Sequence, residues 1–359
     1  MSVTLVHKSE TNCNFAKNST TIPNNNLRQS GRQTMVFENQ PKVIGKMSIV
    51  GQKEGKGPMG QYFDKVLTDD KQGEKCFENS EIRMLTDAVK GATASAKLQI
   101  KDVNLLLSGD LLNQITSSSY VARNLGIPYI GVYSACSTMT ACLAMGAALV
   151  NSGYCQTVAC STASHFATAE RQFRYPLEYG CQRPPYAQWT VTGAGCSILS
   201  SQGNGPRITM ATIGKVIDFG TNDLNNMGAA MAPAAMDTML ALFKENSLSP
   251  ADFDLIITGD LGKLGSDILR DLMREQGYGL GRNYIDCGNM MYYNEQNCYQ
   301  GGSGAACSAS VFNSYILDKM EKGEYSKVAY LATGALMSTQ SCYQGETIPC
   351  ISHAVVIER

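Results

Sequence analysis

The chain has 359 residues, 43% of them hydrophobic, which is enough for two or three domains around a sizeable core. Its formal net charge of −1 at pH 7 argues against a strongly basic nucleic-acid-binding protein. The longest clean apolar run near the middle, residues 141–150, is about half the length of a membrane-spanning helix, so we expect a soluble chain with at most peripheral membrane contact.

The N-terminal residues 1–30 are rich in Asn, Ser and Thr and contain few large apolar side chains. They also lack the hydrophobic region of a secretory signal. We therefore expect a disordered extension, with the folded part beginning at residue 31.

Beyond this extension, helix-like and strand-like patterns alternate along the chain. Helices are expected at residues 82–98, 118–125, 137–150, 235–245, 266–276 and 305–320, and strands at 128–135, 156–162 and 327–334. Such alternation favours parallel sheets covered by helices, with right-handed crossover connections.

One phrase of the sequence occurs twice. Residues 102–112 read DVNLLLSGDLL and residues 252–262 read DFDLIITGDLG, each a buried-strand pattern that ends in a Gly-Asp pair suited to a turn. The wide spacing of the copies indicates a duplicated half-domain, because solenoid repeats recur about every 20 to 50 residues. We predict two pseudo-symmetric halves, residues 31–206 with an insertion at 164–190 and residues 207–359, stacked as α/β/α/β/α layers.

The 13 cysteines are odd in number and include no CxxC pair. Several of them, including Cys142, Cys160, Cys196 and Cys307, stand inside apolar runs. Free, mostly buried thiols in a reducing compartment explain this pattern better than disulfides or a zinc site. No cofactor is expected.

A further cysteine stands where a strand pattern meets a helix pattern, in YIGVYSACSTMTACLAMGAALV at residues 129–150. Cys136 is thereby expected at a helix N-terminus, where unpaired N–H groups stabilise a thiolate or a bound anion. It is then a nucleophile or a ligand-facing thiol. Alternatively, Cys136 is only a small packing residue at a tight turn.

The duplicated halves, the junction at Cys136 and VTGAGCSIL at residues 191–199 resemble the thiolase fold, and within it the β-ketoacyl-acyl-carrier-protein synthase III branch. That resemblance implies acyl transfer from a thioester through Cys136, assisted by a His and an Asn or by two His. Here the expected His position reads Gly259-Asp260-Leu261, and the run GGSGAACS at residues 301–308 places Gly302 at the Asn position.

The chain has three histidines, His7, His165 and His353, and none stands at a catalytic position of the synthases. Each missing assisting group is worth orders of magnitude in rate. The resemblance therefore implies a thiolase-like pocket without condensing chemistry. The alternatives are an acyltransferase or thioesterase that uses Cys136 with an unorthodox base such as His165, and a structural adaptor with a relic pocket.

A second resemblance covers nearly the whole chain after residue 30. The phrases GRQTMVFENQ, GPMGQYFDK, LLLSGDLLNQIT, VARNLGIPYIG, TAERQFRYPLEYG and TGDLGKLGSDIL resemble the stage V sporulation protein AD family of endospore-forming bacteria. This resemblance implies a non-catalytic protein that binds dipicolinic acid and helps load it, with calcium, into the developing spore. It also implies other stage V sporulation A membrane proteins as partners, and a peripheral location on the spore inner membrane, at the cytoplasmic side of the forespore.

A flat dicarboxylate needs N–H donors or cations for its carboxylates and an apolar slot for its ring. The helix start at Cys136 and Ser137 would supply one set of donors, and the glycine-lined start at Gly302, Ser303 and Gly304 a second. These residues are the first candidates for the ligand site.

The insertion supplies His165, Arg171 and Arg174, of which an arginine could grip a carboxylate in bidentate fashion. The alternative is a surface helix that makes ion pairs or a subunit contact. The repeated Asp110 and Asp260 could hold calcium, or each could accept backbone N–H groups in the turn after its strand.

A homodimer is a further expectation, with residues 156–163 as the strand between subunits. The insertion at 164–190 could instead cover that apolar edge.

Overall fold

The computed structural model describes residues 29–173 and 182–359. The strands are β1 Gln29–Ser30, β2 Thr34–Val36, β3 Lys42–Val50, β4 Lys65–Val66, β5 Leu105–Gly109, β6 Tyr129–Gly131, β7 Thr157–Ser164, β8 Trp189–Thr190, β9 Gly193–Ser200, β10 Arg207–Ile213, β11 Leu255–Gly259, β12 Tyr284–Asp286, β13 Gly302–Ser303, β14 Lys327–Ala335 and β15 Cys350–Glu358. The first of these includes two residues that we had assigned to the N-terminal extension.

The six expected helices are found, with ends that differ by up to eight residues and with the last one divided by a π turn, and four short helices were not expected. The helices are α1 Gln52–Gly55, α2 Phe77–Ser95, α3 Thr116–Leu125, α4 Thr138–Asn151, α5 Phe166–Glu170, α6 Met227–Asn246, α7 Gly262–Glu275, α8 Cys287–Met291, α9 Ala305–Val311, α10 Leu317–Glu321 and α11 Thr339–Tyr343. Among the described residues, none of these helices combines the length and apolarity that crossing a membrane requires.

The sheet topology shows the duplication directly. The first half runs β3-β9-β7-β5-β6, and the second runs β10-β15-β14-β11-β12, which is the same order of equivalent strands. The two halves meet where Arg207 of β10 pairs with Lys42 of β3. The repeated phrase forms β5 in one half and β11 in the other, so its spacing correctly indicated a repeated half-domain.

Both half-sheets are mixed, whereas the sequence pattern led us to expect parallel ones. β5 is parallel to β6 and β7, but β9 runs antiparallel to β7. In the connection between these two strands, the described residues 165–173 and 182–192 include one short helix, α5, and β9 returns beside β7. β15 is likewise antiparallel to β14.

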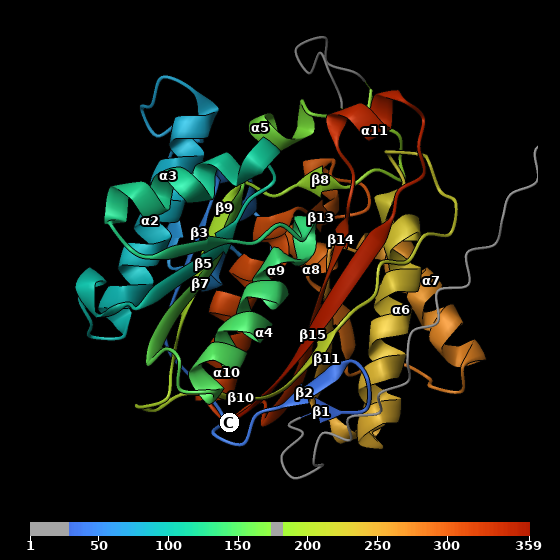
Figure 1. Cartoon of the computed structure of the whole chain (residues 1–359). Coiled ribbons are helices and arrows are strands. Elements are labelled where there is room, and N and C mark those ends of the chain that lie inside the picture. The colour runs from blue at the N-terminus through green and yellow to red at the C-terminus, as the bar shows by residue number, and fades with distance from the viewer. Residues whose placement is uncertain (1–28, 174–181) are drawn as a thin grey trace, which may run out of the picture.

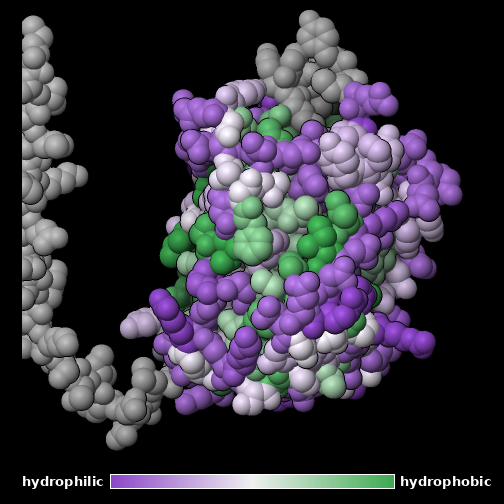
Figure 2. Space-filling view, turned by 90° about the vertical axis from the view of Figure 1, so that its right-hand side faces the viewer, coloured by the Kyte–Doolittle hydropathy of each residue, from purple (hydrophilic) through white to green (hydrophobic). Residues whose placement is uncertain are grey.

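Figure 1 shows the layers that follow from this topology. α4 and α9 lie between the two half-sheets, α2 and α3 cover the outer face of the first, and α6 and α7 cover the outer face of the second. The central helices are apolar or small nearly all round and almost wholly buried, as a middle layer requires. The face beyond α6 and α7 is mainly hydrophilic, with hydrophobic patches near its middle (Figure 2).

The repeated glycines explain why the central helices approach the strands so closely. A Cβ on Gly109 would lie 2.9 Å from Cγ2 of Thr138 on α4, and a Cβ on Gly259 would lie 2.4 Å from the Cβ of Ser308 on α9. Neither distance is sterically allowed, so the Gly of each Gly-Asp pair is needed for packing as well as for the turn.

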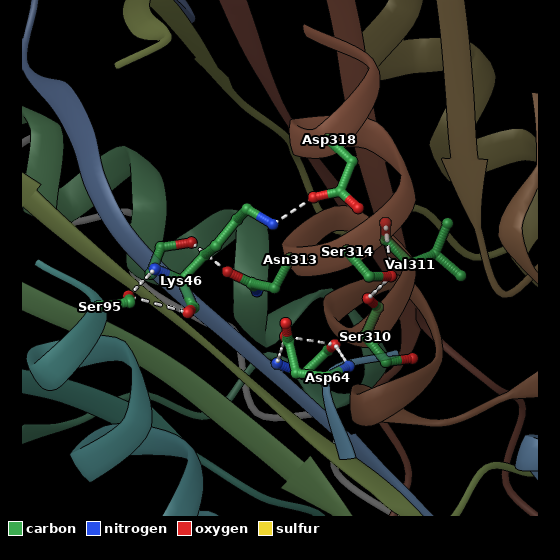
Figure 3. Close-up of polar contacts among 10 residues, drawn as sticks. Lys46, Asp64, Ser95, Ser310, Val311, Asn313, Ser314 and Asp318 are labelled. Atoms are coloured by element: carbon green, nitrogen blue, oxygen red, sulfur yellow. Dashed lines mark hydrogen bonds and ion pairs between the residues drawn. The ribbon is translucent and has the colours of Figure 1, made fainter. Parts of the chain in front are cut away.

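The second central helix differs from the first by a π turn at Phe312–Ile316, between α9 and α10. The buried Asn313 side chain donates to the carbonyl oxygen of Ala309 (2.9 Å) and accepts from the hydroxyl of Ser197 (2.6 Å). One turn further on, Asp318 forms an ion pair with Lys46 of β3 (Figure 3). A wide turn of this kind needs substitutes for missing helix hydrogen bonds, and the asparagine amide is one.

The strand proposed for a dimer is not an edge of the sheet. β7 lies between β5 and β9 and every residue in it is buried, so residues 156–163 cannot pair with a second copy. The edge strand of the first half is β6, where Ile130 is 45% exposed.

Candidate functional site

A cavity of about 300 Å³ opens between the two halves, beside Cys136. Its wall comes from the loops after β5, β6 and β14, from α5 and β8, and from the starts of α6 and α9. It comprises Leu111, Leu112, Asn113, Gln114, Ile115, Tyr133, Ala135, Cys136, Ala169, Gln172, Phe173, Thr190, Met227, Ser303, Gly304, Ala335, Met337, Ser338, Thr339 and Cys342. Most of this wall is apolar, and its polar groups are amides, hydroxyls and thiols. Among the described residues it contains no Lys, Arg or His.

Cys136 lies in a 3-10 turn, Ala135–Ser137, directly before α4. The turn is strained, because Ala135 has a φ of 47°, a conformation that residues with a Cβ rarely adopt. Gly334 of β14 permits it, since a Cβ there would lie 2.3 Å from the carbonyl oxygen of Ser134. Cys136 is consequently held against the cavity and is only 7% exposed.

The thiol of Cys136 is held in its protonated form. Burial raises its pKa far above the usual value, and the nearby carboxyl of Asp260 raises it further. The hydroxyl of Ser303, with its oxygen 3.9 Å from the sulfur, and the amide of Gly304 oppose these effects only in part. The position at a helix start therefore does not produce a thiolate.

The structure brings three of the expected ligand residues together at the cavity: Cys136, Ser303 and Gly304. Ser137 is fully buried behind the wall, where its hydroxyl donates to the carbonyl oxygen of Ser134 (2.7 Å). Gly302 is also behind the wall, and its carbonyl accepts from the side chain of Gln188 (3.1 Å).

The residues of the insertion lie elsewhere. His165 begins α5: its Nδ1 accepts from the amide of Ala167 (3.2 Å), and its Nε2 is 2.9 Å from the carbonyl oxygen of Asp70. Arg171 forms an ion pair with Glu78 of α2. Neither lines the cavity, and Arg174 lies outside the described residues.

The first repeated aspartate, Asp110, has the turn role. Its carboxylate accepts from the amides of Leu112 (3.0 Å) and Ser118 (2.7 Å), which hold the wall loop and the start of α3. Glu81 of α2 lies beside it, and burial raises the pKa of both carboxyls, that of Glu81 to about 8. Over residues 29–173 and 182–359, no three His, Cys, Asp or Glu side chains are arranged to bind a metal ion.

The second repeated aspartate, Asp260, is fully buried, and neither carboxyl oxygen has a hydrogen-bond partner. The amides of its turn, Leu261 and Gly262, donate instead to Asp286 (3.2 and 3.0 Å). Sequence reasoning missed Asp286, because its role depends on β12 lying beside β11. Asp260 is behind Cys136 and Gly304, not in the cavity wall.

The other described histidine, His353, does not act as a base for Cys136, because both of its ring nitrogens face other groups. Its Nδ1 accepts from the amide of Gly214 (3.2 Å), which places the ring proton on Nε2, 3.1 Å from the hydroxyl of Ser134. Burial lowers its pKa to about 4, so the ring is neutral. No imidazole of the described chain is hydrogen-bonded to the Cys136 sulfur.

Sequence reasoning missed most of the apolar wall, including Tyr133, Phe173, Met227 and Met337. Leu111 and Leu112 carried a signal, because they follow the repeated Gly-Asp pair at the carboxyl end of a strand. The others come from loops whose path the sequence pattern does not determine.

Comparison with known proteins accounts for the whole described fold. The model of the stage V sporulation protein AD family matches residues 31–358. The chain belongs to this family. One relative, stage V sporulation protein AD of Bacillus subtilis, is 44% identical over 333 residues, which cover 93% of this chain and 98% of the relative. This protein is thus a sporulation protein.

Solved structures show that this chain has the thiolase fold. The 3-oxoacyl-acyl-carrier-protein synthase III of Aquifex aeolicus matches with a TM-score of 0.55 at 14% identity, covering 89% of this chain and all of the other. OleA of Xanthomonas campestris, solved with lauric acid and lauroyl-CoA, matches with a TM-score of 0.57 at 12% identity, covering 89% and 99%. At these identities the likeness concerns the fold alone.

Proposed function

We propose that this protein is a non-catalytic binder of dipicolinic acid or its calcium chelate, which acts in uptake of that compound into the developing spore. One observation carries the proposal: an apolar cavity stands over a protonated thiol that no described base or cation activates. A thiol without a base is a poor nucleophile. A largely apolar cavity of this volume is typical of sites for small organic ligands.

The shape and chemistry of the wall suit a flat aromatic ring with polar ends. Apolar side chains such as Phe173 and Met227 can cover the ring faces. The hydroxyl of Ser303 and the amide of Gly304 can donate to a polar group of the ligand, and the side-chain amide of Asn113 supplies a further donor in the wall. Family membership supports the same ligand class.

The charge of the wall favours the calcium chelate over the free dianion. Two carboxylates would enter a cavity that has no described cation in its wall and buried carboxyls close behind it. An uncompensated charge in such a place is costly. Calcium bound to the ligand's own carboxylates reduces that cost, because the ligand then brings part of its counter-charge with it.

The remaining parts of the proposal concern place and partners. We propose peripheral attachment to the spore inner membrane, at the cytoplasmic side of the forespore, through the other stage V sporulation A membrane proteins. A homodimer would form along the edge strand β6, which has unpaired backbone groups and the exposed Ile130.

Titration calorimetry of the full chain tests the proposed function. Dipicolinate premixed with calcium should give saturable binding at micromolar concentration or below, and Met337→Trp should abolish it by filling the cavity from its wall. Met145→Trp is the control, since Met145 is 37% exposed and outside the wall. Absence of binding by the folded protein would refute the proposal. Covalent labelling of Cys136 by an acyl thioester would favour an acyltransferase or thioesterase.

A further inference from the structure

The duplication provides an internal comparison for Asp260. In the first half, Ser108 of β5 pairs with Gly131 of β6; in the second, the equivalent Thr258 of β11 pairs with Asp286 of β12. Gly131 has no side chain to offer, so Asp110 must cap the turn after β5 itself. Where the second half has Asp286, that residue caps the turn and Asp260 is released from the task.

Burying an ionised carboxyl that has no hydrogen-bond partner costs folding free energy, and the groups around Asp260 add to that cost. Asp260 is 0% exposed, has a φ of 76°, and accepts no hydrogen bond at either oxygen. The amide of Gly304 and the thiol of Cys307 are near enough to stabilise its ionised form, but neither makes a hydrogen bond of normal geometry to it. Burying such a group unpaired disfavours its charged form.

The titratable groups around Asp260 are all acids. They come from every element packed against it: Cys136 before α4, Asp286 and Cys287 at β12 and α8, Cys307 on α9, and Tyr330 on β14. No Lys, Arg or His is among the described groups that act on it. Burial, with Asp286 as the next cause, raises the pKa of Asp260 well above its usual value.

Asp260 and the cavity share the amide of Gly304. That amide stabilises negative charge both on the Cys136 sulfur and on the Asp260 carboxyl, and Gly304 is also part of the cavity wall. A carboxylate placed in the cavity against Cys136 and Gly304 would therefore lie near an ionised Asp260, because both charges would act on the same two residues. Two such charges in a buried site repel strongly.

We propose that Asp260 is a protonation gate for the cavity: an acidic ligand binds only while the Asp260 carboxyl is neutral, and ionisation of Asp260 expels it. The gate rests on the proposed function, because it acts on the ligand of the same cavity. No bond is made or broken; a proton stays on Asp260 while the ligand is bound. As pH rises through the pKa of Asp260, the proton leaves and affinity falls.

Calorimetry with dipicolinate and its calcium chelate, from pH 6 to pH 10, tests the gate on the full chain. Asp260→Asn is permanently neutral and should bind at pH 7 within about threefold of the wild type. The ratio of wild-type to variant Kd should then rise with pH, by up to about tenfold per unit above the midpoint. Asp267→Asn is the control, since it makes the same substitution at an exposed position of α7 and should keep the wild-type pH dependence. A ratio that stays constant to pH 10, or loss of binding by a folded Asp260→Asn, overturns the gate.

A measurement without ligand separates the gate from the proposed function. Iodoacetamide should alkylate Cys136 faster at pH 9 in Asp260→Asn than in the wild type, because the variant removes a charge that opposes the thiolate. Mass spectrometry of the Cys136 peptide gives the rate. Equal rates would overturn the gate even if dipicolinate binds. Faster alkylation without any ligand binding would support the coupling and refute only the proposed ligand.

Discussion

Glu54 offers the clearest test of the buried electrostatics. It lies on α1, is 1% exposed, and accepts from the hydroxyl of Tyr292 (2.5 Å) and the amide of Thr192 (3.2 Å) through the same oxygen. Its second oxygen has no hydrogen-bond partner. Burial raises the pKa of Glu54 from 4.5 to about 7.

The sign of the pH dependence follows from that shift. The folded protein holds the proton more tightly than the unfolded chain, so the carboxyl costs nothing below pH 4.5 and destabilises increasingly as pH rises through about 7. At pH 8 the full cost is about 3 kcal/mol, because each pKa unit corresponds to about 1.4 kcal/mol. At pH 5 it is about 1 kcal/mol or less.

The perturbation is Glu54→Gln, which keeps an oxygen for Tyr292 and Thr192 and removes the titration. The free energy of unfolding is measured by urea denaturation of the full chain at pH 5, 6.5 and 8. The difference between the variant and the wild type should shift in favour of the variant by about 2 kcal/mol from pH 5 to pH 8. Glu275→Gln, at an exposed position of α7, is the control and should show no such gain. If the difference between Glu54→Gln and the wild type is the same at all three pH values, the assigned burial cost is wrong.

Three further outcomes are expected. Gly259→Ala should lower the free energy of unfolding by about 1–3 kcal/mol in thermal or urea melts, because its Cβ would meet Ser308, whereas Gly279→Ala, with nothing within 4 Å, should not. At pH 7.5 iodoacetamide should label the partly exposed Cys76 and Cys155 well before Cys136, as read by peptide mass spectrometry; first labelling of Cys136 would contradict a protonated thiol. Ile130→Lys should convert a dimer to a monomer in light scattering, and an unchanged mass would remove β6 as the interface.

The sequence predicted the fold well where the signal was local or repeated. The duplicated phrase located β5 and β11, and the apolar runs located α4 and the central helix at 305–320, because burial on all sides leaves a continuous apolar pattern. The direction of β9 was not predicted, since it depends on the path of the insertion before it, which the alternating pattern does not determine. The eleven cysteines of the described chain are all free thiols, as the spacing indicated.

The site was predicted only in part, for a physical reason. Cys136, Ser303 and Gly304 follow from strand-to-helix junctions, which short sequence patterns reveal. Contacts such as Glu54 with Tyr292 join residues 238 apart, and the exchange of roles between Asp260 and Asp286 depends on strand pairing. His165 and Arg171 were candidates because they follow a strand, but α5 turns them toward Asp70 and Glu78.

The π turn in the second central helix also has a mechanical consequence. A π turn holds about one residue more than an α turn, so it rotates everything after it by about 100° relative to a regular helix. Ser303 and Gly304 lie before the π turn, where they line the cavity. Asp318 lies after it, where it pairs with Lys46. The extra residue therefore sets the direction from which Asp318 meets Lys46, and α4, which has no such turn, would present its last residues at a different angle.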